Sequence, residues 1–370
     1  DWGVSSSARL PSDRIAVIAI DDQSIANIGR WPWPREVHAQ LIDKLSAAGA
    51  KTIAHTAFFF EPQTDRGLTE LRTLQSRIDG STTPEPPIRD LSDTARTEIQ
   101  TFIRQAEQRL DADARLEQSM RQAGNVIVPS LFSLGEPQGR PDAPLPAFAQ
   151  RHALTDPIGF GLPAFRTQQP LTAIGEAAAA VAHLNQTADR DGVVRSEPLL
   201  VHFDRLAVPS MGLAIAAHSL NLKTGDIGLL PGEGVRLGGL VIPTDTSARV
   251  LPQFYPDRDG RAAFPLDSFF DVFSGSIPAS KYADKIVIIG ATAAGVGSAF
   301  ATPVSASMSP AETMAHITSS ILGGHFIAEP AWGGLAVLGL LVLVVLYVVL
   351  GVPRLGAAAS AWITGALFLA

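Results

Sequence analysis

The order of apolar and polar positions predicts an α/β fold with a mixed, largely parallel sheet, flanking helices and inserts. Residues 15–20 are six consecutive apolar residues, which is typical of a buried strand. Helix-spaced apolar positions follow Pro34 and end before Gly49, and residues 50–60 form the next apolar run. This strand–helix–strand order predicts a βαβ unit, with two paired parallel strands joined by a right-handed crossover.

The pattern along the rest of the chain predicts an insert at 61–124 and then further strands and helices. Residues 61–90 have an irregular polar pattern, whereas 91–122 read as one long charged helix with a narrow apolar stripe. Two strands, 178–185 and 193–203, are predicted to form a hairpin around the turn at 189–192. The remaining predicted strands are 125–132, 249–255, 285–290 and short ones within 227–242, and the remaining predicted helices are 209–223, 264–273 and 311–322.

Two apolar runs near the C-terminus predict transmembrane helices after the α/β domain. Residues 332–350 carry no charge and are long enough to span a bilayer, and a second run continues from Leu355 to Ala370. We therefore expect one transmembrane helix at 329–351 and the start of a second at 355–370. Arg354 between them places the link in the cytoplasm, because cytoplasmic loops favour positive charge. The domain at 14–328 is then expected in the periplasm, on the outer side of the cell inner membrane.

Residues 1–13 are polar and rich in serine, which predicts a linker. They lack the apolar core of a signal peptide, so we expect that a membrane anchor before Asp1 is missing from the sequence.

Charge and composition narrow the function classes. The net charge is −7 and no run is rich in lysine or arginine, which excludes nucleic acid as an expected partner. The chain has no cysteine, so disulfides and thiolate metal sites are excluded. The eight histidines show no metal-binding spacing, and His38, His218 and His316 are predicted to be surface or hydrogen-bonded core residues. No metal or cofactor is therefore expected.

The stretch from Asp21 to Trp33 holds the most distinctive candidate chemistry. Asp21 and Asp22 follow a buried strand directly, where ligands bind in open α/β sheets, and could act as an acid/base pair or a cation site. Alternatively, one of them caps the following turn while the other is solvated. Trp31 and Trp33 alternate with prolines and form either a ligand wall or a loop packed onto the core.

Other motifs are incomplete. The loop 290–298 has the glycine spacing of a phosphate-binding loop, but Val296 stands where the lysine is required. The sequence DRDG at 189–192 resembles the start of a calcium loop but lacks the later carboxylates, so a turn is predicted. No G-x-S-x-G motif is present to activate a serine. The chain is therefore not expected to be an enzyme.

Five blocks, taken in order, resemble a known family. They are IAIDDQSIANIGRWPWPREVHAQLIDKL from Ile18, FFFEPQTD at 58–65, DRDGVVR at 189–195, KIVIIGATAAGVGSAFATPVS at 285–305 and SPAETMAH at 309–316. Across 10–328 the chain resembles the second type of CHASE domain, an extracellular sensory module of bacterial membrane receptors. The resemblance implies one membrane helix before the sensor, several after it, and a cytoplasmic cyclase or kinase effector.

The resemblance also indicates which residues belong to a candidate ligand pocket. Acidic residues are expected where Thr56 and Ser298 stand, and a glycine and a histidine where Pro310 and Met314 stand. Part of the expected acidic charge is therefore lost, which disfavours a cationic ligand. Asp21, Asp22, Asp65, Arg195 and Glu312 match the family pattern. With the neighbouring aromatic and basic residues, the candidate pocket comprises Asp21, Asp22, Trp31, Trp33, Arg35, Asp65, Arg195 and Glu312.

Two functional hypotheses remain open. The first is a sensor that couples an unknown small ligand, or a periplasmic protein, to its transmembrane helices. The alternative is a non-catalytic structural or accessory subunit that docks onto other membrane protein subunits or associates with itself, with the helix at 91–122 as a contact. A periplasmic hydrolase using Asp21 and Asp22 is disfavoured because no nucleophile, metal set or general base accompanies them.

Overall fold

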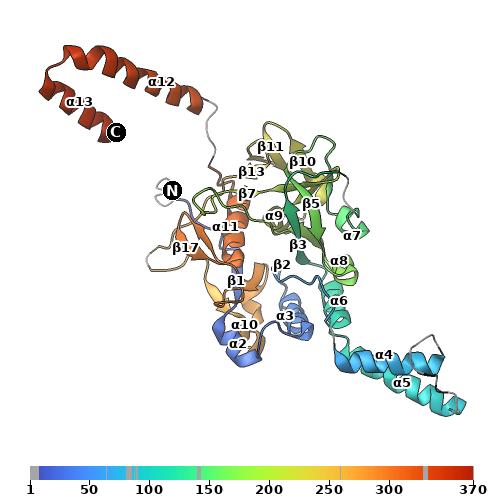
Figure 1. Ribbon diagram of the computed structural model, residues 1–370. Coiled ribbons are helices and arrows are strands. Elements are labelled where there is room, and N and C mark those ends of the chain that lie inside the picture. Colours follow the sequence, from blue (N-terminus) through green and yellow to red (C-terminus); the bar gives the residue numbers. More distant parts are fainter. Residues whose placement is uncertain are drawn as a thin grey trace. The chain divides into compact units, whose positions relative to one another are not determined.

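The structure is a computed structural model that describes residues 8–369 except 64, 81–85, 87, 89–90, 140–142, 259 and 328–331. The linker residues 1–7, the boundary residues 329–331 of the first predicted transmembrane helix and the last residue, Ala370, lie outside the described residues. The chain divides into two compact units, 1–327 and 328–370, which are described separately (Figure 1).

The first unit is built on a large, mostly parallel sheet, which confirms the predicted α/β class. Its strands follow the order β14-β1-β15-β2-β3-β5-β8-β9-β4, and β6 lies beside β3. Pairing is parallel from β14 to β3, between β3 and β6 and between β5 and β8, and antiparallel elsewhere. The bounds are β1 (Ile15–Ile20), β2 (Thr52–His55), β3 (Val126–Leu134), β4 (Leu154–Thr155), β5 (Leu162–Gln168), β6 (Ala180–His183), β8 (Leu200–Phe203), β9 (Leu206–Pro209), β14 (Leu266–Ser268) and β15 (Ile286–Ala291).

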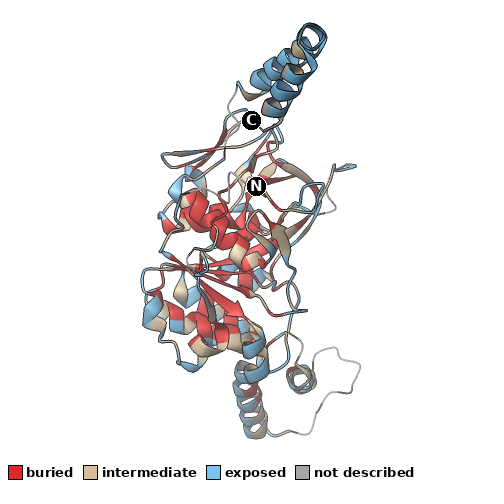
Figure 2. Cartoon of the chain, turned by 90° about the vertical axis from the view of Figure 1, so that its left-hand side faces the viewer, coloured by how far each residue is buried: buried red, intermediate tan, exposed pale blue. Residues whose placement is uncertain are grey.

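Helices cover both faces of this sheet, as the alternation of side chains requires. Ile18 and Ile20 of β1 belong to the larger apolar cluster, whereas Ile15 and Val17 belong to a second cluster. In Figure 2 the buried residues, coloured red, gather in the strands of the sheet and in helices packed against it. The larger cluster includes residues of α3 (Arg35–Ala47), α6 (Ala112–Ala123), α8 (Thr172–Ala177) and α10 (Phe269–Ser274), and the second those of α9 (Met211–Ser219) and α11 (Pro310–Gly323).

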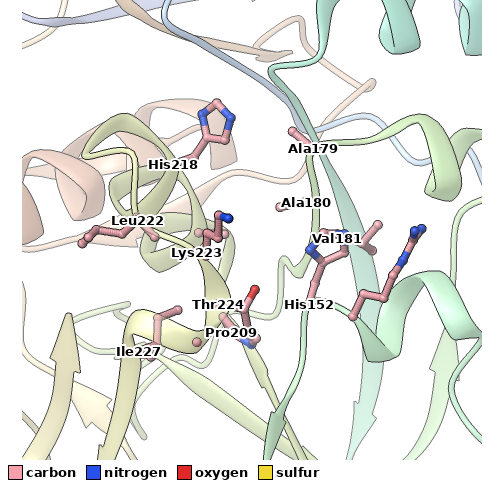
Figure 3. Close-up of a pocket in the computed structure, with 14 residues that line it drawn as sticks. His152, Ala179, Ala180, Val181, Pro209, His218, Leu222, Lys223, Thr224 and Ile227 are labelled. Carbon is pink, nitrogen blue, oxygen red and sulfur yellow. The ribbon is translucent and has the colours of Figure 1, made fainter. Parts of the chain in front are cut away.

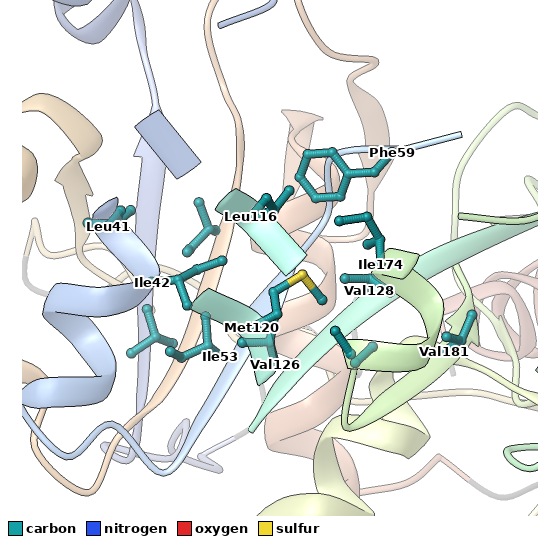
Figure 4. Close-up of a cluster of buried hydrophobic side chains, with 14 of the residues drawn as sticks. Leu41, Ile42, Ile53, Phe59, Leu116, Met120, Val126, Val128, Ile174 and Val181 are labelled. Carbon is teal, nitrogen blue, oxygen red and sulfur yellow. The ribbon is translucent and has the colours of Figure 1, made fainter. Parts of the chain in front are cut away.

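The larger cluster joins the start of the chain to the insert. Figure 4 shows Leu41 and Ile42 of α3 lying beside Leu116 and Met120 of α6, with Val126 of β3 below them. All five side chains are fully buried. The end of the insert is therefore part of the core.

The predicted pairing of the first two strands is wrong. β1 and β2 are parallel, but β15 lies between them and pairs with both. β15 contributes four consecutive side chains, Ile286 to Ile289, that are all fully buried. A strand that is apolar on both faces is stable at the centre of a parallel sheet, and this explains why a distant segment takes the middle position.

The insert contains more helix, and one more break, than predicted. The irregular stretch includes α4 (Arg66–Asp79), so this part of the prediction is wrong. The single helix predicted for 91–122 is two helices, α5 (Asp93–Leu110) and α6, separated at Asp111. Asp111 leaves the helical conformation and its carboxylate accepts a hydrogen bond from the Ala114 amide, which starts α6 with a side-chain cap.

The predicted hairpin is confirmed only at its turn. The Gly192 amide donates to the Asp189 carbonyl at 2.9 Å and Thr187 forms one antiparallel bridge with Ser196, but the strands beyond them pair elsewhere. β6 joins β3, because the buried Val181 and Ala182 complete the core there. The second segment divides between β8 and β7 (Glu197–Pro198), which pairs with β13 (Arg249–Val250).

The remaining elements of the first unit are short. The strands predicted within 227–242 form an antiparallel sheet, the strand predicted at 249–255 is reduced to β13, and the segment at 264–273 holds β14 before α10. The helix predicted at 209–223 is the shorter α9. The remaining bounds are α2 (Asp22–Ile28), which was not predicted, α7 (Ala147–Gln150), η1 (Thr224–Asp226), β10 (Ile227–Leu230), β11 (Gly234–Leu237), β12 (Leu240–Pro243), η2 (Ala279–Tyr282), β16 (Phe300–Thr302) and β17 (Ser305–Met308).

The second unit consists of apolar helices. α12 (Gly333–Leu346) continues through η3 (Tyr347–Gly351) and η4 (Val352–Arg354). Together, Gly333–Arg354 form a helix of 22 residues that is long and apolar enough to cross a membrane. The segment predicted to start a second span contains the shorter helix α13 (Ala357–Leu369). The Tyr347 hydroxyl donates to the Ser360 carbonyl at 3.0 Å within this unit.

Candidate functional site

A cavity of about 550 Å³ lies at the carboxyl edge of the parallel strands. Ile20 ends β1 and Ala291 ends β15, while Thr56 and Leu184 directly follow β2 and β6. In open parallel sheets, ligands bind outside the carboxyl ends of the strands. The cavity also has the size of a small-molecule site. We take it as the candidate functional site and call it the carboxyl-edge cavity.

The wall of this cavity is mainly apolar and aromatic. Trp31, Pro32, Phe58, Leu131 and Phe300 contribute to it. Trp31 meets the ring of the buried Trp33 edge-on, with ring centroids 5.2 Å apart. It meets the ring of His38 in the same way at 5.7 Å, so it is fixed by its neighbours. A preformed aromatic wall of this kind favours an uncharged, largely apolar ligand.

Four polar side chains complete the lining, and one of them lacks a partner. The Thr56 hydroxyl donates to the Ile289 carbonyl at 3.1 Å. The Asn185 amide group both accepts from and donates to the backbone of Phe132. Ser298 is exposed. The Gln186 Oε1 atom is buried and has no hydrogen-bond partner among the described residues, so it is available to accept a hydrogen bond from a ligand.

Gln186 connects the cavity to a buried carboxyl group. Its Nε2 donates to Glu197 Oε2 at 3.0 Å, and Glu197 is only 1% exposed. Burial raises the pKa of Glu197 to about 8, although hydrogen bonds from Ser210 and Gln186 favour the ionised form. A neutral carboxyl group therefore fixes the Gln186 side chain at neutral pH. The sequence prediction missed both residues.

The adjacent carboxylates Asp21 and Asp22 do not line the cavity. The Asp21 carboxylate caps α2 by accepting hydrogen bonds from the amide and the hydroxyl of Ser24 and from the Ser268 hydroxyl. Asp22 is exposed in the first turn of α2. The structure therefore matches the alternative stated from the sequence, in which one carboxylate caps the following turn and the other is solvated.

The two tryptophans divide between the two proposed roles. Trp31 lines the cavity, whereas Trp33 is 3% exposed and donates from its indole nitrogen to the Gly29 carbonyl at 2.8 Å. The peptide bond between Trp31 and Pro32 is cis. Trp33 therefore packs the loop onto the core, and Trp31 faces the ligand space.

Arg35 fixes the insert to the core. Its guanidinium donates to the Asp113 carboxylate and to the Glu61 carbonyl, and lies over the Phe59 ring at 5.1 Å from the centroid. The partly buried guanidinium is therefore paired on several sides.

The other three candidates stabilise local structure. Asp65 caps α4 by accepting from the Leu68 amide at 2.8 Å. Glu312 forms a capping box with Ser309 at the start of α11. Arg195 pairs with Asp189 and Asp191 across the hairpin turn, and hydrogen bonds to both carboxylates raise its pKa. None of the three lies in the carboxyl-edge cavity.

Three of the four positions that depart from the family pattern meet at the cavity. Thr56, Ser298 and Pro310 all line it, while Met314 is fully buried in the core. No carboxylate lines the cavity, and no group of three or more histidine or acidic residues in the described part of the chain could hold a metal ion.

The predicted histidine roles hold in the structure. His38 and His55 are buried and hydrogen-bond to each other at 3.0 Å, and the Tyr255 amide donates to His316 at 3.0 Å. His218 is half-buried and pairs with the Thr52 hydroxyl. Each of these histidines therefore has a hydrogen-bond partner in the structure.

Comparison with known proteins agrees with this architecture. The family model of the CHASE2 domain matches residues 1–353, nearly the whole chain and most of its first apolar helix. No curated protein and no solved structure matches the chain. From the extent of the family match, the chain belongs to the CHASE2 family, a family of extracellular sensory domains.

Proposed function

We propose that the carboxyl-edge cavity is the ligand site of a sensor. Its ligand is a small, largely apolar, uncharged molecule with one hydrogen-bond donor. The aromatic wall around Trp31 supports the apolar character, and the buried Oε1 of Gln186 supports the donor. In this proposal the chain senses a molecule and does not transform it.

One observation supports coupling most directly: Pro310, the first residue of α11, is part of the cavity wall. α11 is buried along most of its length, packs against β1, β15 and α9, and ends before Gly324. The next described helix along the chain is α12, which starts at Gly333. A ligand that contacts Pro310 therefore contacts the helix that leads towards the apolar segment. Differential binding to two positions of α11 would shift their populations.

The location follows from the same proposal. In this proposal the cavity lies in an extracytoplasmic unit, and the helix Gly333–Arg354, which is long and apolar enough to cross a membrane, spans the bacterial inner membrane. Arg354 at its end supports a cytoplasmic position for that end, and with it a periplasmic position for the sensor.

The test uses the absence of cysteine from the chain, which lets one introduced thiol report on the cavity. In the full chain, purified in detergent, Ser298→Cys is labelled with a maleimide in the presence of neutral aromatic amides and alcohols, beginning with benzamide. A compound that raises Tm is expected to slow labelling at position 298. Gln186→Leu is expected to weaken its binding about tenfold, because the acceptor is lost.

The matched control is Ser276→Cys, since Ser276 is exposed and lies outside the cavity lining. Its labelling should not change with ligand. Slower hydrogen exchange at the first turn of α11 on binding would support coupling. A compound that stabilises the chain but neither protects position 298 nor responds to Gln186→Leu would contradict the proposal.

A docking role is the second candidate, and α5 provides the observation that favours it. Phe102 on α5 is 60% exposed although α5 packs against α4. An exposed aromatic ring of this kind suits a protein contact in a membrane complex or between copies of the chain. Co-purification of fixed partners that are lost in Phe102→Ser would favour this role over sensing.

A further inference from the structure

A second cavity lies at the opposite, amino-terminal edge of the sheet. It has a volume of about 370 Å³ and is lined by Ala179 and Ala180, where β6 begins. His218 lines it from α9, and its Nδ1 lies 2.8 Å from the hydroxyl of Thr52, the first residue of β2. The two cavities share no lining residue. We call this one the amino-edge cavity.

Positive and neutral donor groups line the amino-edge cavity, and no carboxylate does. Arg151 and His152 follow α7, while Lys223 and Thr224 come from the segment of η1. Figure 3 shows the Lys223 amine and the Thr224 hydroxyl pointing towards the side on which His152 lies. Within the described residues, neither Arg151 nor Lys223 forms an ion pair.

The nearest carboxylate on η1 is already used by the backbone. Asp226 accepts a hydrogen bond from the Lys223 amide at 2.8 Å. It does not line the cavity, so no carboxylate in the lining balances the positive charges of Arg151 and Lys223.

The two histidines of the lining both have lowered pKa values, mainly because they are partly buried. Burial and the nearby charge of Arg151 lower the pKa of His152, and burial and Lys51 lower the pKa of His218. An anion bound between these groups would raise both pKa values, because it stabilises the protonated imidazoles.

The remainder of the wall is apolar. Val181 contributes from β6, Ala214 and Ala217 from α9, and Leu222 from the turn after it. A ligand that fills the cavity must therefore present an apolar surface on one side and a negative charge on the other.

We propose that the amino-edge cavity binds a small organic anion with a compact apolar body, whose charge is held by Lys223, Arg151 and His152. This site is separate from the carboxyl-edge cavity, and the inference does not depend on the proposed function.

The test is calorimetric titration of the full chain in detergent with phenyl phosphate, benzoate and inorganic phosphate. Phenyl phosphate or benzoate is expected to bind more tightly than inorganic phosphate, because only the aromatic anions use the apolar wall. The aromatic probe that binds more tightly shows whether the site prefers a phosphate or a carboxylate group. Lys223→Met and Arg151→Gln should each weaken binding about tenfold, since a charge-assisted hydrogen bond is lost. Both residues are exposed, so the fold should be retained.

The control Lys281→Met removes an exposed positive charge that pairs with Asp267 outside the cavity, and it should leave binding unchanged. Gln186→Leu should also leave it unchanged, which separates this site from the carboxyl-edge cavity. Wild-type affinity should rise as the pH falls from 8 to 6, and His152→Gln should reduce this rise. Absence of binding at millimolar probe, wild-type affinity in both cavity variants, or an equal loss in Lys281→Met would overturn the proposal.

Discussion

At the residue scale, the burial of Glu197 beside the carboxyl-edge cavity makes the stability of the chain depend on pH. Its pKa is raised to about 8 by burial, so the folded chain keeps a proton that the unfolded chain releases near the ordinary value of 4.5. The stabilisation is complete below about pH 4.5 and is lost as the pH rises towards 8. Gln186 orients this proton-bearing group from the cavity side.

We predict that Tm of the full chain falls between pH 6.5 and 8, and that Glu197→Gln removes this fall. One proton contributes up to about 1.4 kcal/mol per pH unit to the free energy of unfolding. Thermal unfolding at several pH values measures the slope. Glu233→Gln, at an exposed glutamate, is the control and should keep it. An unchanged slope in Glu197→Gln would show that another group titrates.

Gly290 gives a second prediction at this scale. A Cβ atom at this position would lie 2.3 Å from the Thr56 hydroxyl oxygen and 2.8 Å from the Ala311 Cβ. Gly290→Ala should therefore destabilise the chain by about 1–3 kcal/mol through overpacking. Denaturant unfolding measures the change. Gly239→Ala, where the added atom meets nothing within 4 Å, should be nearly neutral. A neutral Gly290→Ala would mean that Thr56 and α11 can move apart.

At the element scale, one carboxylate connects the insert to the core. Asp113 in the first turn of α6 accepts from the Arg35 guanidinium at the start of α3 and from the Gln63 amide at 2.9 Å. The pair is partly buried, so its loss leaves the guanidinium without its anionic partner. The effect is greater than at a fully exposed pair.

We predict that Asp113→Asn lowers the stability by about 1–3 kcal/mol and speeds hydrogen exchange in α4 and α5 more than in the sheet. Hydrogen exchange with mass spectrometry makes the comparison. Glu117→Gln, which breaks an exposed pair with Arg121 on the same helix, should cost less than about 1 kcal/mol. Equal effects of the two variants would exclude Asp113 as the anchor.

The elements that local sequence could predict are those whose pattern is complete within one segment. The apolar runs of β1 and β15 and the helical spacing of α3 are of this kind. The helix α4 was missed although Asp65 and Gly80 supply both of its caps, because the segment is otherwise polar. The place of β15 between β1 and β2 has no local signal, since it depends on burial by distant helices.

The candidate site was predictable only in part for the same reason. The family resemblance indicated Thr56 and Ser298 as positions that have lost an expected acidic residue, and the proline-flanked loop indicated Trp31; all three line the cavity. The capping role of Glu312 was readable from its spacing after Ser309. The only sequence signal for Glu197 is its position in a predicted strand, among apolar residues. Its link to Gln186 is a tertiary contact that no spacing reveals.

At the scale of the whole molecule, buried histidines set the acid limb of stability. Burial lowers the pKa values of His55, His183 and His316 to about 3, and that of His38 is also well below 6.5. The unfolded chain takes up protons on these groups below about pH 6.5, whereas the folded chain does not. Stability is therefore lost as the pH falls from 6.5 towards 3.

We predict a maximum of Tm near pH 6.5, with the histidine limb below it and the Glu197 limb above it. His183→Asn retains an acceptor for the Asn185 amide but removes one titrating group, so it should flatten the acid limb. The pH dependence of Tm between 5 and 6.5 tests this, because exposed carboxylates are mostly ionised there in both states. A limb as steep as that of the wild type would mean that His183 is not among the groups responsible.

The two short strands β2 and β6 bring the two cavities close enough for binding at one to affect binding at the other. Each strand has four residues, so the opposite edges of the sheet are only about 13 Å apart along them. Any free energy by which an anion at the amino edge alters binding at the carboxyl edge must act equally in the reverse direction. If both proposed sites bind their ligands and this coupling free energy is not zero, the concentration of each ligand shifts the apparent affinity of the chain for the other.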